Sequence, residues 1–193
     1  IKEGMTENMR RRGGAESLLL TFPVDKSIQG MNLKEIAEKW NKPPIETAIE
    51  IIKNGGSAIA SFNMQDSDIQ DFMKKDWVMT CSDGTSAHPR KYGTFPKKIR
   101  EYVFEKKTLT LEEMIRKSTS FPAEIYGIKK RGKIELGYFA DLLIFKPENV
   151  KDNATFEKPD EYSEGFDWII LNGKIVVENG EFLGDLEGRV IRR

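Results

Sequence analysis

Apolar residues recur at helical spacing twice between residues 32 and 56. Asn32 can cap the first helix, whose apolar positions lie three and four residues apart: Leu33, Ile36, Ala37 and Trp40. The second helix is predicted to begin at Pro43-Pro44 and to end at Gly55-Gly56. Its predicted inner face consists of four apolar residues: Ile45, Ala48, Ile49 and Ile52. The spacing therefore predicts two amphipathic helices.

Short strands and further helices continue the pattern as far as residue 127. Residues 57–62 read as a short strand, and residues 66–73 as an acidic helix with three inward-facing residues: Ile69, Phe72 and Met73. Residues 76–80 form a short apolar run that we predict to be a buried strand. Two more helices follow, one marked by Ile99, Tyr102 and Val103 and one opened by a capping box at 110–113 with an apolar inner face: Leu111, Met114 and Ile115. A short helical turn is expected at 122–127.

From residue 132 onward, strands replace helices. Residues 132–137 and 140–145 are predicted strands, and 168–177 is a predicted hairpin because Asn172-Gly173 suits a type I′ turn. The charged segment 146–164 lies between them as a long excursion. Two strands and a hairpin are too few for an independent domain, so we expect them to complete a sheet whose other strands lie elsewhere in a longer protein.

Composition and charge exclude several classes of protein. The 193 residues include 31 basic and 31 acidic side chains, so net charge indicates neither nucleic acid nor an acidic membrane surface as a partner. No apolar run approaches the roughly 20 residues that a membrane helix needs. The single cysteine excludes an internal disulfide framework and fits a reducing cytosol, so we expect a cytoplasmic protein. The chain starts at Ile1 rather than at a methionine, and we expect it to be part of a longer protein.

The residues after the predicted strand 76–80 carry the candidate chemistry. An acid, Asp83, and an arginine, Arg90, cluster with turn residues where that strand would end. In barrel enzymes the reacting groups sit at the carboxyl ends of strands, because the loops there converge on one opening. Asp83 is therefore placed like a catalytic carboxylate, although an Asp-Gly pair also favours a plain turn.

Two neighbouring residues have plainer interpretations. His88 is the only histidine, and a catalytic zinc typically takes about three protein ligands, so we interpret His88 as a loop residue near the site. Cys81 lies on the predicted strand, and we expect its thiol to be buried and unreactive.

Several segments resemble one family. Residues 132–145 look like the close of the amidohydrolase superfamily, where the chain leaves the barrel and returns to a small β-sandwich. Five further segments together resemble the N-acyl-D-amino-acid deacylases, or D-aminoacylases: 82–84, 88–96, 152–159, 162–165 and 188–193. The part from Arg10 to Gly56 is similar to the small inserted region that covers the active site of that family.

The resemblance implies an α/β fold that is the C-terminal portion of a TIM-barrel amidohydrolase, with an inserted α/β lid, the last βα unit and strands of a small β-sandwich. By this reading, residues 1–70 hold the lid-like region and the segment before it. Residues 71–127 hold the last βα unit with its following helices, and residues 128–193 hold the closing strands of the sandwich. The N-terminal part of the barrel would be missing from this chain, so we expect exposed apolar surface and self-association.

The resemblance also implies an activity. The family hydrolyses the amide of a small molecule, an N-acyl-D-amino acid, to a carboxylate and a free D-amino acid. Asp83 would take a proton from a zinc-bound water and pass it to the leaving amine. Arg90 would bind the α-carboxylate of the substrate, since a guanidinium can do so through two hydrogen bonds; beside Pro89 it also reads as a surface arginine.

Zinc is implied as the cofactor of the intact enzyme, with its ligands on earlier strands. The chain alone is therefore expected to hold no catalytic zinc and to be inactive. Two alternatives stay open. One is part of a hydantoinase-type hydrolase of cyclic amides, and the other is a non-catalytic binding or structural relative.

Overall fold

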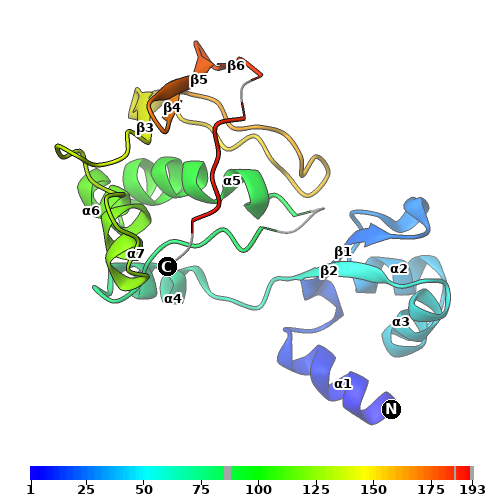
Figure 1. The fold of residues 1–193 in the computed structure, drawn as a ribbon. Coiled ribbons are helices and arrows are strands. Elements are labelled where there is room, and N and C mark those ends of the chain that lie inside the picture. The colour runs from blue at the N-terminus through cyan, green and yellow to red at the C-terminus, as the bar shows by residue number, and fades with distance from the viewer. Residues whose placement is uncertain (85–87, 185, 192–193) are drawn as a thin grey trace.

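The computed structural model describes residues 1–84, 88–184 and 186–191, which form two groups of elements (Figure 1). The first group holds one antiparallel strand pair and three α-helices: α1 (Lys2–Arg11), β1 (Leu18–Pro23), α2 (Leu33–Lys39), α3 (Pro44–Lys53) and β2 (Ser57–Ser61). The second group starts with helices: α4 (Asp66–Lys74), α5 (Arg90–Lys97), a π-helix (Lys98–Glu105), α6 (Leu111–Ser118) and α7 (Ser120–Ile125). It ends with a four-stranded antiparallel sheet in sequential order: β3 (Leu142–Phe145), β4 (Phe166–Leu171), β5 (Lys174–Glu178) and β6 (Glu181–Phe182).

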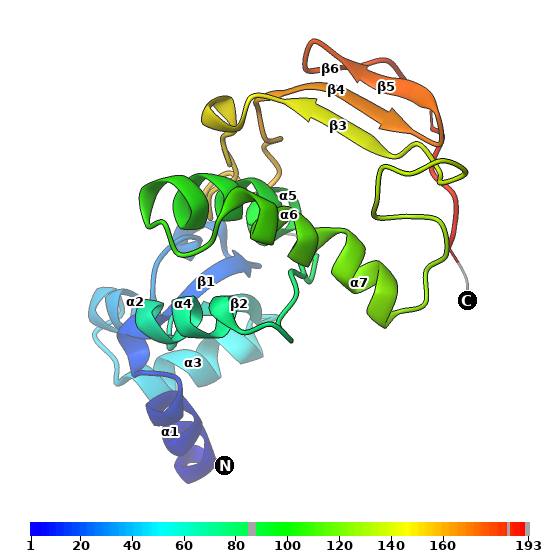
Figure 2. The same ribbon diagram turned by 90° about the vertical axis from the view of Figure 1, so that its left-hand side faces the viewer.

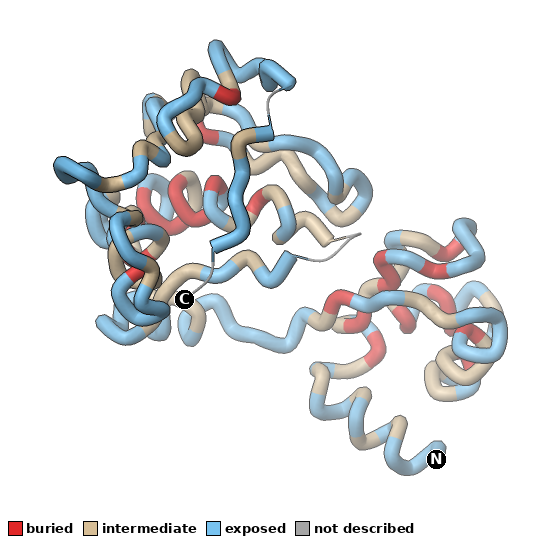
Figure 3. The backbone as a smooth tube through the Cα atoms, in the orientation of Figure 1, coloured by how far each residue is buried: buried red, intermediate tan, exposed pale blue. Residues whose placement is uncertain are grey.

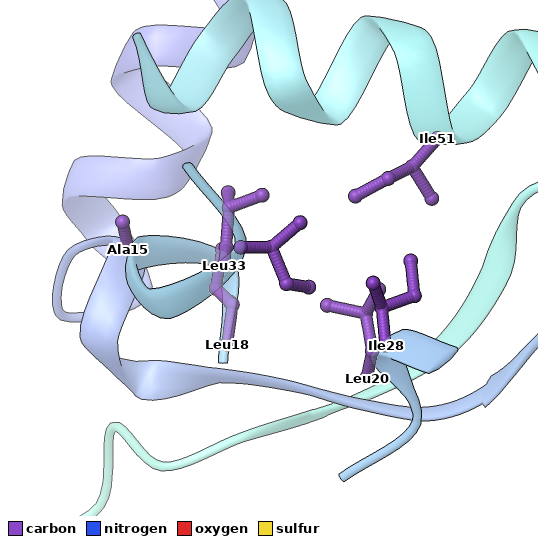
Figure 4. Packing of buried hydrophobic residues seen from close by; sticks show 7 residues of the cluster. Ala15, Leu18, Leu20, Ile28, Leu33 and Ile51 are labelled. Atoms are coloured by element: carbon purple, nitrogen blue, oxygen red, sulfur yellow. The ribbon is translucent and has the colours of Figure 1, made fainter. Parts of the chain in front are cut away.

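The first group has a hydrophobic core of its own. The strand β1 pairs with β2 in a register that places Leu18 opposite Ser61. Seven buried apolar residues fill the space between this pair and the helices (Figure 4): Ala15, Leu18, Leu20, Ile28, Leu33, Ile36 and Ile51. Burial of apolar area is the main favourable contribution to such a fold, so this core stabilises the packing of the strand pair against the helices.

The helix after Asn32 is confirmed. Asn32 accepts a hydrogen bond from the backbone N–H of Glu35, and the Glu35 carboxylate accepts one from the backbone N–H of Asn32. This reciprocal capping box satisfies two donors that the first turn of a helix leaves open. Leu33, Ile36 and Ala37 are buried, as their spacing predicts.

The helix α3 begins at Pro44 and ends before Gly55-Gly56 as predicted, and the predicted inner residue Ala48 packs against the core, but the rest of the buried face differs from the prediction. Thr47 and Ile51 are its buried residues, whereas Ile52 is 62% exposed. Thr47 can be buried because its hydroxyl donates a hydrogen bond to the carbonyl of Pro43 at 3.1 Å. The apolar pattern does not predict a buried Thr47, because it counts only apolar side chains as inward-facing.

The second group is built around a layer of helices. Figure 2 shows the sheet on one side of α5 and α6 and α4 on the other. Its core joins the π-helix, α6 and the segment after β3 through five buried residues: Ile99, Val103, Leu109, Met114 and Val150. The capping box at Thr110 and Glu113 is confirmed by both of its hydrogen bonds. On α4, Met73 packs against this core, whereas Phe72 is 54% exposed.

The prediction of a buried strand at 76–80 is wrong. Within the described ranges the segment joins no sheet, Trp77 is 67% exposed and Cys81 is exposed as well. The side chain of Lys117 on α6 donates to the carbonyls of Lys75 and Val78, the latter at 3.0 Å. The segment is thus held by a helix rather than by a neighbouring strand, which an apolar run alone does not reveal.

The predicted strand at 132–137 is also wrong, whereas the predicted strand after it and the hairpin are confirmed. Ile134 and Leu136 are fully or nearly fully exposed, at 91% and 101%, and the segment forms turns. By contrast, Asn172 and Gly173 have φ values of 51° and 86°, as a type I′ turn between β4 and β5 requires.

Buried positions concentrate in the first group, including its strand β1, and in the helices of the second group. Figure 3 shows them along the first group and along the helices of the second, while the sheet is mostly half-buried or exposed. Several apolar side chains of the sheet are more than 40% exposed: Leu143, Ile144, Ile175 and Phe182. Self-association through such surface stays a prediction. In the described part of the chain no helix has the length and apolar character to cross a membrane.

We expect that replacing Lys117 with methionine lowers the free energy of unfolding by about 2 kcal/mol, because two carbonyls lose their donor. Urea denaturation followed by circular dichroism measures this change. Lys53→Met, at an exposed position on α3, is the matched control and should stay within about 0.5 kcal/mol of the wild type. Equal stability of Lys117→Met and wild type would contradict the assigned role.

Candidate functional site

The structure brings Asp83 and Arg90 together. A guanidinium nitrogen of Arg90 lies 3.0 Å from a carboxylate oxygen of Asp83. Asp83 has a φ of 44°, a left-handed conformation that aspartate tolerates better than most residues. Arg90 is the first residue of α5, so the helix fixes the position of its backbone. The Asp83 side chain is 75% exposed and that of Arg90 36%, and both groups remain accessible to a ligand.

His88 holds the start of the helix that carries Arg90. Its ring nitrogen Nδ1 accepts a hydrogen bond from the backbone N–H of Arg90 at 3.1 Å. The first N–H groups of a helix have no partner within the helix, so this contact satisfies a donor that needs one. Burial lowers the pKa of His88, the positive charge of Arg90 acts in the same direction, and Asp83 opposes both. A neutral imidazole keeps the Nδ1 lone pair that this bond requires.

The segment 151–164, here named the 151–164 loop, lies along α5. The carboxylate of Asp152 accepts hydrogen bonds from Arg100 at 2.6 and 3.2 Å. At the other end of the loop, the hydroxyl of Ser163 donates to the carbonyl of Tyr92 on α5 at 2.9 Å. The predicted long excursion is therefore a packed loop that reaches the beginning of α5.

Two buried lysines support the segment that leads to Asp83. The ammonium of Lys98 donates to the hydroxyl of Thr80 at 2.6 Å, and the backbone N–H of Thr80 donates to the carbonyl of Lys117 at 3.0 Å. Lys98 and Lys117 are 5% and 3% exposed. Burial, together with the nearby charge of Lys117, lowers the pKa of Lys98 to about 8. Thr80 is thus fixed on both its side chain and its backbone.

Sequence reasoning missed both lysines, because a charged residue on a helix is normally assigned to the solvent face. One signal was present. Lys117 follows Met114 at a spacing of one helical turn, so it lies on the face that the apolar pattern marks as inward.

The described residues do not assemble a metal site by themselves. In the ranges that the structure describes, no group of three or more His, Cys, Asp or Glu side chains could hold a metal ion. The expectation of a buried Cys81 is wrong, since this thiol is exposed where the 76–80 segment fails to form a strand. The site therefore offers one carboxylate that can accept a proton and one guanidinium that can bind an anion.

Comparison with known proteins gives a consistent match. The family described as "Amidohydrolase family" matches residues 25–177. A D-aminoacylase from Alcaligenes xylosoxydans xylosoxydans is 34% identical over 170 residues, which are 86% of this chain and 34% of that protein. The chain thus spans about a third of the length of this relative.

Solved structures agree with the sequence match. The crystal structure of a D-aminoacylase that defines a novel subset of amidohydrolases superposes with a TM-score of 0.81 at 32% identity, covering 91% of this chain and 38% of that one. An N-acyl-D-glutamate deacylase from Bordetella bronchiseptica, complexed with zinc and a phosphonate inhibitor that mimics the tetrahedral intermediate, superposes with a TM-score of 0.77 at 26% identity. It covers 86% of this chain and 36% of that one. The chain therefore shares an α/β fold with metal-binding deacylases over most of its length.

Because Lys98 is buried, we expect the free energy of unfolding to change with pH in the alkaline range. Its pKa is about 8 in the folded protein and near 10.5 in the unfolded chain, so between these values the unfolded chain binds more protons. Raising the pH from about 8 to about 10.5 should therefore raise the stability contribution of Lys98, by about 2 kcal/mol.

The measurement is the difference in unfolding free energy between the wild type and Lys98→Met at pH 7.5 and pH 10. Taking the difference cancels the titration of all other groups. The unfolding free energy of the wild type minus that of Lys98→Met should be larger at pH 10 than at pH 7.5. A difference that does not change with pH would show that Lys98 keeps an ordinary pKa.

Proposed function

The chain belongs to the amidohydrolase family, and from that premise we propose that it is the C-terminal part of a zinc-dependent hydrolase of N-acyl-D-amino acids. The reaction cleaves the amide bond and gives a carboxylate and a free D-amino acid. The observation that carries the proposal is the Asp83–Arg90 pair, held at 3.0 Å in a chain that shares its fold with D-aminoacylases.

Asp83 has the chemistry of a proton carrier in this reaction. As a carboxylate it accepts a proton from the attacking water, and it then donates that proton to the nitrogen of the leaving amine. Its side chain is 75% exposed, so a water and a substrate can reach it. A bound zinc would acidify that water, but the described residues form no ligand set for it, so its ligands belong elsewhere in the protein.

Arg90 has the chemistry of a carboxylate receptor. Its guanidinium can bind the α-carboxylate of the substrate through two parallel hydrogen bonds, which fixes the orientation of the molecule. Anchoring the carboxylate beside Asp83 would determine which enantiomer presents its amide to the reacting groups. This supports an N-acyl-D-amino acid as the substrate class.

The finer architecture is part of the same proposal. Residues 1–70 would form a lid-like region, 71–127 the last βα unit of a TIM barrel, and 128–193 the closing strands of a small β-sandwich. The separate core of the first group supports the lid as a unit of its own. The chain alone would be inactive, and its single exposed thiol agrees with a cytoplasmic location.

In the protein that the gene encodes, Asp83→Asn should lower kcat on N-acyl-D-amino acids by about 10²- to 10⁴-fold, because it removes the proton carrier. Zinc content, measured by atomic emission, should be the same in the variant. Asp71→Asn, an exposed residue of α4, is the control and should keep full activity. Full activity of Asp83→Asn, or turnover of cyclic amides alone, would overturn the proposal.

Arg90→Lys in the same protein should raise KM roughly tenfold to a hundredfold, because a lysine cannot make the paired hydrogen bonds of a guanidinium. We expect kcat to change much less. Steady-state kinetics on an N-acyl-D-amino acid and on the matching amide without an α-carboxylate tests the assignment. The variant should lose little on the second substrate, and equal losses on both would contradict carboxylate binding.

A further inference from the structure

The ring of Phe156 joins three segments that are far apart in sequence. Its centroid lies 5.0 Å from that of His88 and 5.3 Å from that of Phe62, and both pairs are edge-to-face. Phe62 directly follows β2, His88 lies just before α5, and Phe156 belongs to the 151–164 loop. Figure 1 shows this loop between β3 and β4 extending along α5 toward the β1–β2 pair.

We propose that Phe156 is a positioning residue of the substrate site: it holds the His88 ring, and through it the start of α5 and Arg90, and it ties the β1–β2 unit to that point. The inference rests on the proposed function, because it takes Arg90 as the receptor for the substrate carboxylate.

The first step runs from Phe156 to His88. The imidazole of His88 supports Arg90 only in the orientation that points Nδ1 at the backbone N–H, at 3.1 Å. An edge-to-face contact is a favoured geometry for two aromatic rings, and it restricts rotation of the imidazole. Removing the Phe156 ring would leave His88 free to turn away from Arg90.

The second step concerns why Phe156 is itself fixed. Lys151 and Glu164 pair through two backbone hydrogen bonds, of 3.1 and 3.0 Å, that close the base of the loop. Near its tip, the backbone N–H of Thr155 donates to the carbonyl of Lys158, and the hydroxyl of Thr155 accepts from the backbone N–H of Lys158, both at 3.1 Å. Phe156 lies inside this turn, so its ring is carried by an ordered backbone.

The third step runs from Phe156 to the first group. The backbone N–H of Phe62 donates to the carbonyl of Ser17 at 2.8 Å, which fixes Phe62 to the segment that opens β1. A displacement of the β1–β2 unit therefore acts on Phe156, and Phe156 acts on His88. The position of that unit is in this way coupled to the start of α5.

The test begins with hydrogen exchange of the Arg90 amide in the protein that the gene encodes. In Phe156→Ala this amide should exchange about tenfold faster than in the wild type, because its acceptor is no longer held. Phe156→Tyr keeps the ring and should restore the slow rate. His88→Ala should match Phe156→Ala, and the double variant should show no further increase.

Phe72→Ala is the matched control. It removes a ring from another edge-to-face pair, with Trp77 at 6.4 Å, in α4. Its Arg90 amide should exchange as in the wild type. Phe156→Leu keeps the apolar volume of the side chain but has no aromatic ring. Fast exchange of the Arg90 amide in this variant would therefore come from loss of the ring and not from unfolding. Unchanged exchange in both Phe156→Ala and Phe156→Leu would overturn the inference, whether or not the protein hydrolyses anything.

A kinetic measurement completes the design. Phe156→Ala should raise KM for an N-acyl-D-amino acid about tenfold with little change in kcat, and Phe156→Tyr should reverse the rise. A fall in kcat with KM unchanged would contradict a role in substrate positioning. Faster exchange of Arg90 in a protein that hydrolyses no N-acyl-D-amino acid would overturn the proposed function and uphold the coupling of Phe156 to Arg90.

Discussion

Two buried ammonium groups hold the segment on which the site depends. Lys117 donates to the carbonyls of Lys75 and Val78, and Lys98 donates to the hydroxyl of Thr80. Backbone carbonyls need hydrogen-bond partners, and here the side chain of a helical lysine supplies the donor where a sheet would use a neighbouring strand. Asp83 lies three residues after Thr80, so these contacts limit where its backbone can lie. The burial that lowers the pKa of Lys98 is the energetic cost of this arrangement.

Arg90, the second residue of the site, is supported by other elements than Asp83. Arg90 starts α5, and both His88 and the 151–164 loop pack at that end of the helix. A carboxylate and a guanidinium thus meet at 3.0 Å although each is supported by different elements. Such a pair near the surface contributes little to stability, typically about 0–1 kcal/mol, so the stability of the fold does not depend on it.

Local signals in the sequence predicted what local interactions determine. The capping boxes at Asn32 and Thr110 and the turn at Asn172-Gly173 are each complete within a few residues, and all three are confirmed. The strand at 76–80 and the buried Cys81 were wrong because both depend on partners far away in sequence. The sequence already placed Asp83 and Arg90 in one cluster, whereas the contacts of the two buried lysines and of Phe156 join segments that are far apart in sequence.

The most direct test of the account is a comparison of enantiomers with the protein that the gene encodes, loaded with zinc. Initial rates are measured on an N-acyl-D-amino acid, on its L-enantiomer and on a cyclic amide, with chiral chromatography of the product. We expect release of the free D-amino acid and negligible turnover of the other two. Opening of the cyclic amide, or no turnover of any substrate by the zinc-loaded protein, would contradict it.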